Sequence, residues 1–459
     1  MAECVDVIII GAGVVGCAIA RELSRCDISV TVLERSDDVG NATSKANTAI
    51  LHTGFDCEPG SLESRLVSSG YRRLLAFAES SGIAVEKTGA ILVAWSEDQL
   101  AQLPKLRAKA EANGYDKVRI ISASEITALE PHLGDGVLGG LAVPDEFIID
   151  PWSPVIAFAT QAQRGGVAFV FNAEVTAASR SDGIHLLETS QGSFRSTWVI
   201  NAAGLYSDVI NGFCGHDEFT ITPRRGELIV FDKLARSLVS SIILPVPTQT
   251  TKGVLVAPTV YGNVLLGPTA DDVEDKQATA TTEDGFTRLL EAGQRIMPEL
   301  IDEEITASYA GLRAASQHRD YQIHLHADEH YVCVGGIRST GLTASMAIGD
   351  YIAELLEDHG LAPRAEEPPT ITMPPLGETQ VRPFSDSARI KRDPLFGEIL
   401  CHCEYVTAGE IRDAATGPLG AKTVEGLRRR TRAMNGRCQG FYCSAEIMNR
   451  FDALFEDQR

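Results

Sequence analysis

The chain has 459 residues, of which 44% are hydrophobic and 22% are charged, and its formal net charge is -21. This length predicts two or three domains, and the composition is typical of a globular protein rather than a disordered or fibrous one. The negative charge argues against nucleic acid as a partner, because phosphate binding needs a positive surface.

The most hydrophobic stretch is "VIIIGAGVVGCAIA" near the N-terminus. It is too short and too rich in glycine to span a bilayer, and it lacks the basic lead-in of a signal peptide. We therefore expect a cytoplasmic protein without a transmembrane segment, and leave contact with a membrane surface open. Ten cysteines in a reducing compartment are then buried thiols or metal ligands rather than disulfides.

The first 35 residues follow the pattern of a dinucleotide-binding unit. An apolar strand leads into Gly11, Gly13 and Gly16 at GxGxxG spacing, then a helical pattern, then a second strand that ends at Glu34. The glycines allow a tight turn, close approach to a pyrophosphate and close helix packing, while the acid can accept the ribose hydroxyls. The spacing does not choose between FAD and NAD, although the acid disfavours NADP.

Two later apolar strands also run into turns of small residues: "STWVINAAGLYSD" (196–208) and "YVCVGGIRSTGLTAS" (331–345). Such turns present backbone N–H groups to a polar ligand, although an ordinary strand-to-helix connection explains either one alone. Taken together they suggest one long cofactor held from end to end. The candidate cofactor-binding residues beyond Glu34 are Thr43, Ser44, Val175, Gly204, Gly336, Gly341, Leu342 and Thr343.

The sequence resembles one family, the FAD-dependent oxidoreductases of the D-amino-acid oxidase and glycerol-3-phosphate dehydrogenase type. It is also similar to L-2-hydroxyglutarate dehydrogenase. The resemblance rests on the motifs "GAGVVGCAIARELS", "TSKANTAILHTGF", "PGSLESRL", "NAAGLYSD", "GNVLLGPTA", "YAGLRAAS" and "GIRSTGLTAS", spread over about the first 360 residues. It implies FAD as the cofactor, and because no second GxGxxG is present, the sequence does not support a separate NAD site.

We expect an α/β fold: a Rossmann-like FAD-binding domain of glutathione-reductase type with an antiparallel-sheet substrate domain and a small helical domain at the C-terminus. Hydrophobic periodicity shifts toward two between 219 and 330, as antiparallel strands require. A proline-rich stretch then lacks any apolar period, which is typical of a linker. The expected boundaries are 1–362 for the oxidoreductase part (FAD segments about 1–90, 150–215 and 331–360; substrate domain about 91–149 and 216–330), 363–395 for the linker and 396–459 for the C-terminal domain.

The tail contains four soft ligands, Cys401, Cys403, Cys438 and Cys443. Four thiolates suit either a 2Fe-2S cluster or a structural zinc, although the paired CxxC knuckles common in zinc sites are absent. The segments "CHCEYVTAGEI" and "RRRTRAMNGRCQGFYC" resemble the bacterioferritin-associated-ferredoxin-like domain, which implies a 2Fe-2S cluster.

The residues between and after these cysteines are helical in pattern. The stretch 407–410 predicts a capping box, 423–434 a helix, and Ser444 the start of a last amphipathic helix, whose positive end should favour the thiolate of Cys443. The basic run "LRRRTR" (427–432) has two interpretations. It offsets the charge of the cluster and covers a helix face, or it docks an acidic redox partner.

Three residues are candidates for the catalytic site. His52 is the best candidate for the catalytic base, because the ordinary pKa of histidine lies near working pH. The alternative is a structural histidine at the end of a strand. The resemblance implies that Arg313 clamps a carboxylate or phosphate and that Arg338 lies near the flavin, and a planar guanidinium suits such a clamp. Lys252 is a further cation, more simply explained as an exposed lysine.

The hypothesis is a flavin-dependent dehydrogenase that oxidises a small anionic substrate, a polyol phosphate or a 2-hydroxy acid, by hydride transfer to FAD. Electrons then pass through the 2Fe-2S cluster to a redox partner subunit or an acceptor such as a quinone. Two departures limit the resemblance: the family's hydroxyglutarate enzymes tend to place a histidine where this chain reads "TTKGVLV", and membrane-bound glycerol-3-phosphate dehydrogenases have a different C-terminal region. The alternatives are an amino- or imino-acid dehydrogenase or oxidase, and an electron-transfer module without its own substrate.

Overall fold

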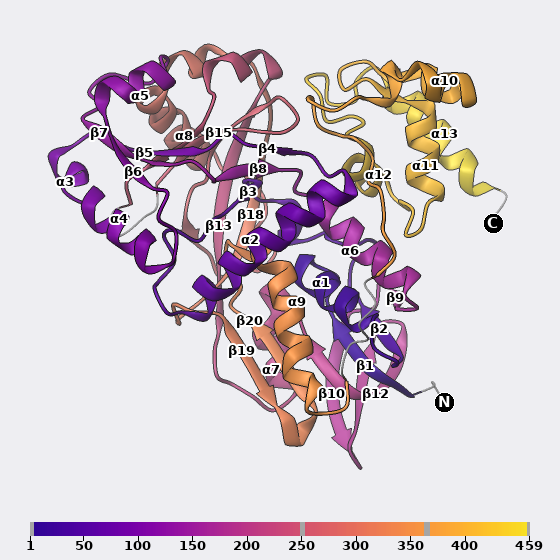
Figure 1. The fold of residues 1–459 in the computed structure, drawn as a ribbon. Coiled ribbons are helices and arrows are strands. Elements are labelled where there is room, and N and C mark those ends of the chain that lie inside the picture. Colours follow the sequence, from indigo (N-terminus) through magenta and orange to yellow (C-terminus); the bar gives the residue numbers. More distant parts are fainter. Residues whose placement is uncertain (1–3, 248–252, 362–367, 457–459) are drawn as a thin grey trace.

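The computed structural model describes residues 4–247, 253–361 and 368–456. Figure 1 shows two sheet-based parts stacked in the view, with a smaller C-terminal unit on their flank. Among the described helices, none combines the length and hydrophobicity needed to cross a bilayer.

The first part is built on an eight-stranded sheet whose centre is parallel, in the order β9-β2-β1-β12-β20. Its strands are β1 (Cys4–Ile10), β2 (Val30–Leu33), β9 (Ala168–Val170), β10 (Val175–Ser181), β11 (Ile184–Thr189), β12 (Gly192–Asn201), β19 (Gln322–His326) and β20 (Tyr331–Gly335). The three apolar runs predicted as strands, β1, β12 and β20, are therefore neighbours. Buried branched residues such as Ile8 and Val199 explain why these segments prefer the middle of a sheet.

Helices cover this sheet. The helix that follows β1, α1 (Val14–Leu23), contacts both α6 (Ser153–Arg164) and α9 (Gly341–Glu357), and α2 (Leu62–Ser81) contacts α9 in turn. Figure 1 shows α1, α2 and α9 together beside the sheet. The predicted Rossmann-like fold is confirmed, with α1 and α9 each beginning at a glycine-containing turn.

The second part is a nine-stranded sheet, in which only the β5–β14 pairing is parallel. Its strands are β5 (Ala90–Ala94), β6 (Arg119–Ser122), β7 (Gly139–Val143), β13 (Ile221–Phe231), β14 (Ile242–Pro245), β15 (Leu255–Pro258), β16 (Val264–Gly267), β17 (Asp271–Asp272) and β18 (Ile305–Ser316). Its helices are α3 (Glu97–Leu100), α4 (Leu103–Ala112), α5 (Ala123–Leu129) and α8 (Glu283–Ile296). Although β19 lies inside the segment predicted as substrate domain, it pairs with β20 in the first sheet.

Shorter elements connect these parts. A three-stranded sheet of β3 (Ile50–Leu51), β8 (Phe147–Ile149) and β4 (Val85–Glu86) lies near α2, and α7 (Ser207–Phe213) follows β12. The pairing of β3 with β8 brings the segment before 52 next to the segment around 147. This pairing brings together two side chains of the candidate functional site described below.

The C-terminal unit, called here the C-terminal module (residues 383–456), contains α10 (Ser387–Arg392), β21 (Ile399–Cys401), β22 (Val406–Thr407), α11 (Ala408–Thr416), α12 (Val424–Thr431) and α13 (Ser444–Glu456). It has its own small hydrophobic core. The predicted capping box at Thr407 and Glu410 is present, and α13 begins at Ser444 as predicted. The predicted helix over 423–434 ends early, because Arg432 adopts φ +66. The predicted linker boundary at 395/396 falls inside a short 3-10 turn, Pro394–Gly397.

Candidate functional site

The turn between β1 and α1 has the shape that a dinucleotide needs. A Cβ on Gly11, which has φ +104, would lie 2.6 Å from a backbone carbonyl oxygen, and one on Gly16 would lie 1.9 Å from the Gly11 carbonyl oxygen. Side chains are excluded at both positions by the protein itself. Gly13 differs, because its Cβ would meet only the Ser44 hydroxyl at 3.3 Å. That hydroxyl accepts a hydrogen bond from Val14 N at 2.9 Å, so the predicted residues 13 and 44 face each other across the helix start.

Glu34 is fixed at the end of β2. Its Oε2 accepts from Ala12 N at 2.7 Å, and its Oε1 accepts from Ser36 N at 2.8 Å. The backbone carbonyl of Glu34 accepts from Ala173 N at 2.8 Å, which brings the start of β10, and thus the buried Val175, to the same edge. The carboxylate therefore lies beside the glycine turn, as binding of a ribose requires.

The other predicted cofactor residues lie on three further segments. Thr43 donates its hydroxyl to the carbonyl of Leu312 on β18 at 2.9 Å. The remaining residues mark turns or helix starts: Gly204 (φ +56) after β12, Gly336 (φ +63) after β20, and Gly341, Leu342 and Thr343 at the start of α9. The structure thus brings the three predicted strand-to-helix turns to one edge of the first sheet, since β1, β12 and β20 are parallel neighbours.

A cavity of about 1150 Å³ begins at this edge. Thr43 lines it, as do the chain neighbours of Glu34, Gly204 and Arg313, namely Arg35, Leu205 and Leu312. The residues that line it include neither Glu34 nor the candidate catalytic residues His52, Arg313 and Arg338. The lining comes from both sheet-based parts of the chain and from the C-terminal module.

His52 lies directly after β3 and is held by two partners. Its backbone N donates to the Thr343 hydroxyl at 3.0 Å, and its Nδ1 lies 3.0 Å from Oε2 of Glu146. Glu146 is completely buried, and its other oxygen accepts from the backbone N (2.6 Å) and the hydroxyl (2.8 Å) of Thr53. A buried carboxylate that is fixed in this way orients the ring through its Nδ1.

Sequence reasoning missed Glu146. It lies 94 residues from His52, and β8, which follows it, pairs with β3. The available signal was an acid in the run "PDEFIID", directly before a strand of buried hydrophobic residues. A carboxylate at such a position needs partners, although the sequence does not say which.

The two candidate arginines have different surroundings. The side chain of Arg313, half-buried on β18, makes no ion pair or hydrogen bond with any described residue. Burial, together with repulsion from Arg224, lowers the pKa of its guanidinium. Arg338 lies 3.5 Å from Glu63, so its charge is already compensated. No contact between described residues joins Arg313 to His52 or Arg338. Lys252 lies outside the described residues.

The four cysteines of the C-terminal module lie as two pairs. The largest influence on the pKa of Cys403 among the thiols comes from Cys438, and that on Cys443 comes from Cys401, so these cysteines are neighbours in pairs. A single tetrahedral zinc needs four sulfurs about 3.8 Å apart. In the described part of the chain, the one group of three or more ligand atoms within 4.8 Å contains none of these cysteines. Two pairs of thiols fit two metal ions that take two thiolates each, as in a 2Fe-2S cluster.

The backbone near Cys438 also favours the thiolate form of this cysteine. Burial alone would raise the pKa of Cys438, but the N–H groups of residues 440–442 and the thiol of Cys403 hold it below the ordinary thiol value. The prediction for Cys443 is wrong: burial, followed by the influence of Cys401, raises its pKa to about 12 despite its place before α13.

The basic run of the module is buried against the rest of the chain. Asp38, which follows β2, accepts from Arg429 at 2.7 Å and from Arg430 at 2.6 and 2.8 Å, and all three side chains are buried. Burial would raise the pKa of Asp38, but the two guanidinium groups lower it. Neither interpretation of the basic run included this role: Arg429 and Arg430 bind a carboxylate of the first part.

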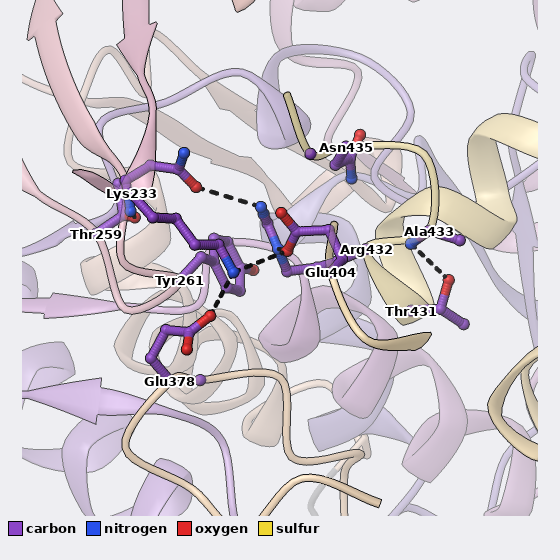
Figure 2. A network of polar contacts seen from close by, with 12 residues as sticks. Lys233, Thr259, Tyr261, Glu378, Glu404, Thr431, Arg432, Ala433 and Asn435 are labelled. Atoms are coloured by element: carbon purple, nitrogen blue, oxygen red, sulfur yellow. Dashed lines mark hydrogen bonds and ion pairs between the residues drawn. The ribbon is translucent and has the colours of Figure 1, made fainter. Parts of the chain in front are cut away.

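Arg432 makes a second contact of this kind, shown in Figure 2. Its Nε donates to Glu404 at 2.9 Å, its guanidinium lies 3.9 Å from the ring centre of Tyr261, and a further N–H donates to Asn263 at 3.3 Å. Lys233, beside the second sheet, reaches Glu404 at 3.3 Å. Burial would raise the pKa of Glu404, but these two cations lower it. The module is therefore docked on the first part by the buried ion pairs of Asp38, and on the second part by the Lys233–Glu404 pair and the contacts of Arg432.

This docking places the module in the wall of the large cavity. Arg428, Arg432, Asn435 and Gln439 line the same space as Thr43. Gln439 is the chain neighbour of Cys438. The cysteine loop, through Gln439, and one residue predicted to bind the cofactor, Thr43, thus border one cavity.

Comparison with known proteins agrees with this division. Residues 6–355 match the family described as FAD dependent oxidoreductase, and residues 399–452 match the BFD-like 2Fe-2S binding domain. The chain is 35% identical over 447 residues to a glycerol 3-phosphate dehydrogenase of Caloramator mitchellensis. This match covers 96% of this chain and 93% of the relative. It is 27% identical over 412 residues to the mitochondrial L-2-hydroxyglutarate dehydrogenase of Homo sapiens, covering 76% of this chain and 88% of the relative.

A solved structure has the same fold over most of the chain. It is the dithionite-reduced L-alpha-glycerophosphate oxidase from Mycoplasma pneumoniae with FAD bound, which is 33% identical, with a TM-score of 0.77. The match covers 81% of this chain and 99% of that one. About a fifth of this chain therefore has no counterpart in the oxidase.

Proposed function

This chain belongs to the FAD dependent oxidoreductase family, and we propose that it is a dehydrogenase that oxidises the secondary hydroxyl of glycerol 3-phosphate. Its cofactors are FAD and a 2Fe-2S cluster. The observation that carries the proposal is that the dehydrogenase relative covers 96% of this chain, whereas the glycerophosphate oxidase covers 81%. The segment beyond the oxidase match contains the 2Fe-2S binding domain, and we propose that it gives this enzyme a route for exporting electrons.

When bound, FAD supplies the acceptor for the hydride and the cluster supplies one-electron transport. Oxidation of the substrate also releases the proton of its hydroxyl, and we assign its removal to Nε2 of His52. Glu146 supports this role, because its buried carboxylate fixes the ring through Nδ1 and stabilises the imidazolium that forms.

Arg313 is proposed to bind the substrate phosphate. A half-buried guanidinium with no anionic partner among the described residues is costly, and a phosphate would compensate it. Its planar fork suits two phosphate oxygens. Arg338, already paired with Glu63, is proposed to lie beside the cofactor rather than to bind the substrate anion.

The shared cavity wall supports electron transfer within the chain. Gln439, next to Cys438, lines the same cavity as Thr43, and the buried ion pairs of Asp38 with Arg429 and Arg430 keep the module in place. On its outer side, the cysteine loop exposes Phe441 and Tyr442, at 81% and 82%. We propose that the redox partner approaches this loop. The cytoplasmic location also stays a prediction.

An anaerobic titration tests the substrate. The visible spectrum of the purified enzyme is followed while glycerol 3-phosphate, 2-hydroxyglutarate and a set of amino acids are added separately. We expect glycerol 3-phosphate to bleach the flavin at near-stoichiometric amounts. Bleaching only by 2-hydroxyglutarate or an amino acid would replace the proposed substrate, and no bleaching by any metabolite would favour an electron-transfer module.

A further inference from the structure

A group of imidazole and carboxylate side chains lies at the first sheet, away from the cysteine module. His216 and Glu218 belong to the loop between α7 and β13, and His326 ends β19. One ligand atom from each lies within 4.8 Å of the other two. We infer that these three residues form a binding site for a divalent transition-metal ion of the Zn²⁺ class, in addition to the 2Fe-2S cluster.

The distances between the ligand atoms agree with a shared ion. Glu218 Oε1 lies 3.2 Å from His326 Nε2 and 3.6 Å from His216 Nδ1. Ligands about 2.0–2.2 Å from one tetrahedral zinc are roughly 3.3–3.5 Å apart. The buried Nε2 of His326 makes no hydrogen bond with any described residue, although the carboxylate oxygen is so near. This is the arrangement expected when two lone pairs point at a common third position instead of at each other.

A surrounding layer of side chains fixes the ligands. The second ring nitrogen of His216, Nε2, lies 3.0 Å from Glu329 Oε2, the carboxylate–histidine arrangement that orients metal-binding imidazoles. The second oxygen of Glu218 accepts from Asn211 at 2.6 Å, and Asn211 in turn accepts from the Tyr331 hydroxyl at 3.0 Å. Asn211 and Tyr331 are completely buried, so Glu218 is held from the interior of the domain.

The ligand set selects the class of ion. Two imidazoles and one carboxylate suit Zn²⁺ and its neighbours better than Ca²⁺ or Mg²⁺, which prefer oxygen ligands only. The side chains of His216, Glu218 and His326 are 14%, 32% and 21% exposed, which gives an ion access from solvent. The two rings now stack with centroids 3.7 Å apart, and binding of both to one ion would open them to about 5 Å. Such an ion would tie the loop after α7 to the end of β19.

Metal titration of the holoenzyme, with its cluster in place, tests the site. We expect one Co²⁺ per chain to give visible d–d absorption without the near-ultraviolet charge transfer of cobalt–thiolate bonds, and Zn²⁺ to raise the Tm. Both effects should disappear in His326→Gln. The matched control is His324→Gln, two residues away on the same strand, whose ring nitrogen lies 3.4 Å from Gln322. Glu329→Gln should weaken binding about 10–100-fold, because it removes only the outer partner.

Three results would overturn the inference: no Zn²⁺-dependent Tm shift in the wild-type enzyme, the same shift in His326→Gln, or a cobalt spectrum with thiolate charge transfer, which would place the ion on the cysteines. If His326→Gln does not fold, Glu218→Gln gives the same comparison. Flavin bleaching by substrate is measured in parallel, so failure of the metal site and failure of the proposed function are read separately.

Discussion

Nδ1 of His52 lies 3.0 Å from a carboxylate oxygen of Glu146, a residue that solvent does not reach. Burial of a carboxylate is costly unless it is hydrogen-bonded, and here Thr53 supplies two donors to its other oxygen. The imidazole of His52 is therefore oriented by a group whose position is itself fixed.

The first prediction is that Glu146→Gln lowers kcat with the true substrate on the order of 10²-fold, because the imidazolium loses its counter-charge. The pH profile of kcat/KM should also shift. The control is Glu130→Gln, another buried glutamate that accepts two backbone N–H groups, from Ser240 and Ser241. If kcat falls equally in both variants and the pH profile of kcat/KM does not change, Glu146 has only a structural role.

The second prediction concerns the substrate anion. Arg313→Lys keeps the charge but loses the planar fork, so it should cost about 1.5–3 kcal/mol in transition-state stabilisation, measured as kcat/KM. Arg224→Lys is the matched control, since this arginine pairs with Arg313 across β13 and β18 but its side chain is bound to Asp272. Equal kcat/KM in Arg313→Lys and the wild-type enzyme would remove Arg313 from the substrate site.

These two residues show what a sequence can and cannot predict. The glycine turn, Glu34 and the four cysteines follow from local spacing, and the structure has the predicted strands and helix starts around them. Glu146 and Asp38 do not follow from spacing, because their roles depend on which strands pair and on how the module docks. The pairing of Arg429 and Arg430 with Asp38 could not be predicted for the same reason, because Asp38 lies far away in the chain.

The third prediction separates two glycines of one motif. Gly13→Val should fold but purify with little flavin, because its side chain meets only Ser44 in the protein and fills the space through which a pyrophosphate would approach. Gly16→Ala should instead fail to fold properly, since its Cβ would overlap the Gly11 carbonyl oxygen. The measurements are the flavin-to-protein absorbance ratio and the Tm. A full complement of FAD in Gly13→Val would refute the proposed pyrophosphate position.

The fourth prediction tests the docking of the module. Asp38→Asn leaves two buried guanidinium groups without their carboxylate, which typically costs about 3–5 kcal/mol. We expect the module to unfold or separate at lower urea than the rest, seen as an extra transition. Asp413→Asn, which changes an exposed carboxylate paired with Arg412, should leave the transition unchanged.

The same carboxylate gives this docking a pH dependence. Because the folded-state pKa of Asp38 is lowered, its contribution to stability is present above the ordinary aspartate pKa of about 4 and is lost as the pH falls through the lower folded value. The extra transition should thus appear in the wild-type protein only at acidic pH. A wild-type module that stays docked at pH values well below 4 would contradict the assignment.

The last prediction concerns the reason for a cysteine module on a flavin enzyme. Cys438→Ser removes a soft ligand, the one whose pKa the neighbouring backbone lowers, and should destroy the cluster. The FAD-binding part has its own sheets and cores, so it should still fold and bind FAD. Substrate should then bleach the flavin of the variant at nearly the wild-type rate.

Electron export, by contrast, should stop. In the wild-type enzyme, substrate added without oxygen should produce the paramagnetic resonance signal of a reduced 2Fe-2S cluster, and in Cys438→Ser this signal should be absent. Turnover should fall with membrane or quinone acceptors but persist with a dye that takes electrons directly from the flavin. The exposed Cys4, changed to serine, is the control. Normal turnover of Cys438→Ser with every acceptor would mean that the cluster is structural.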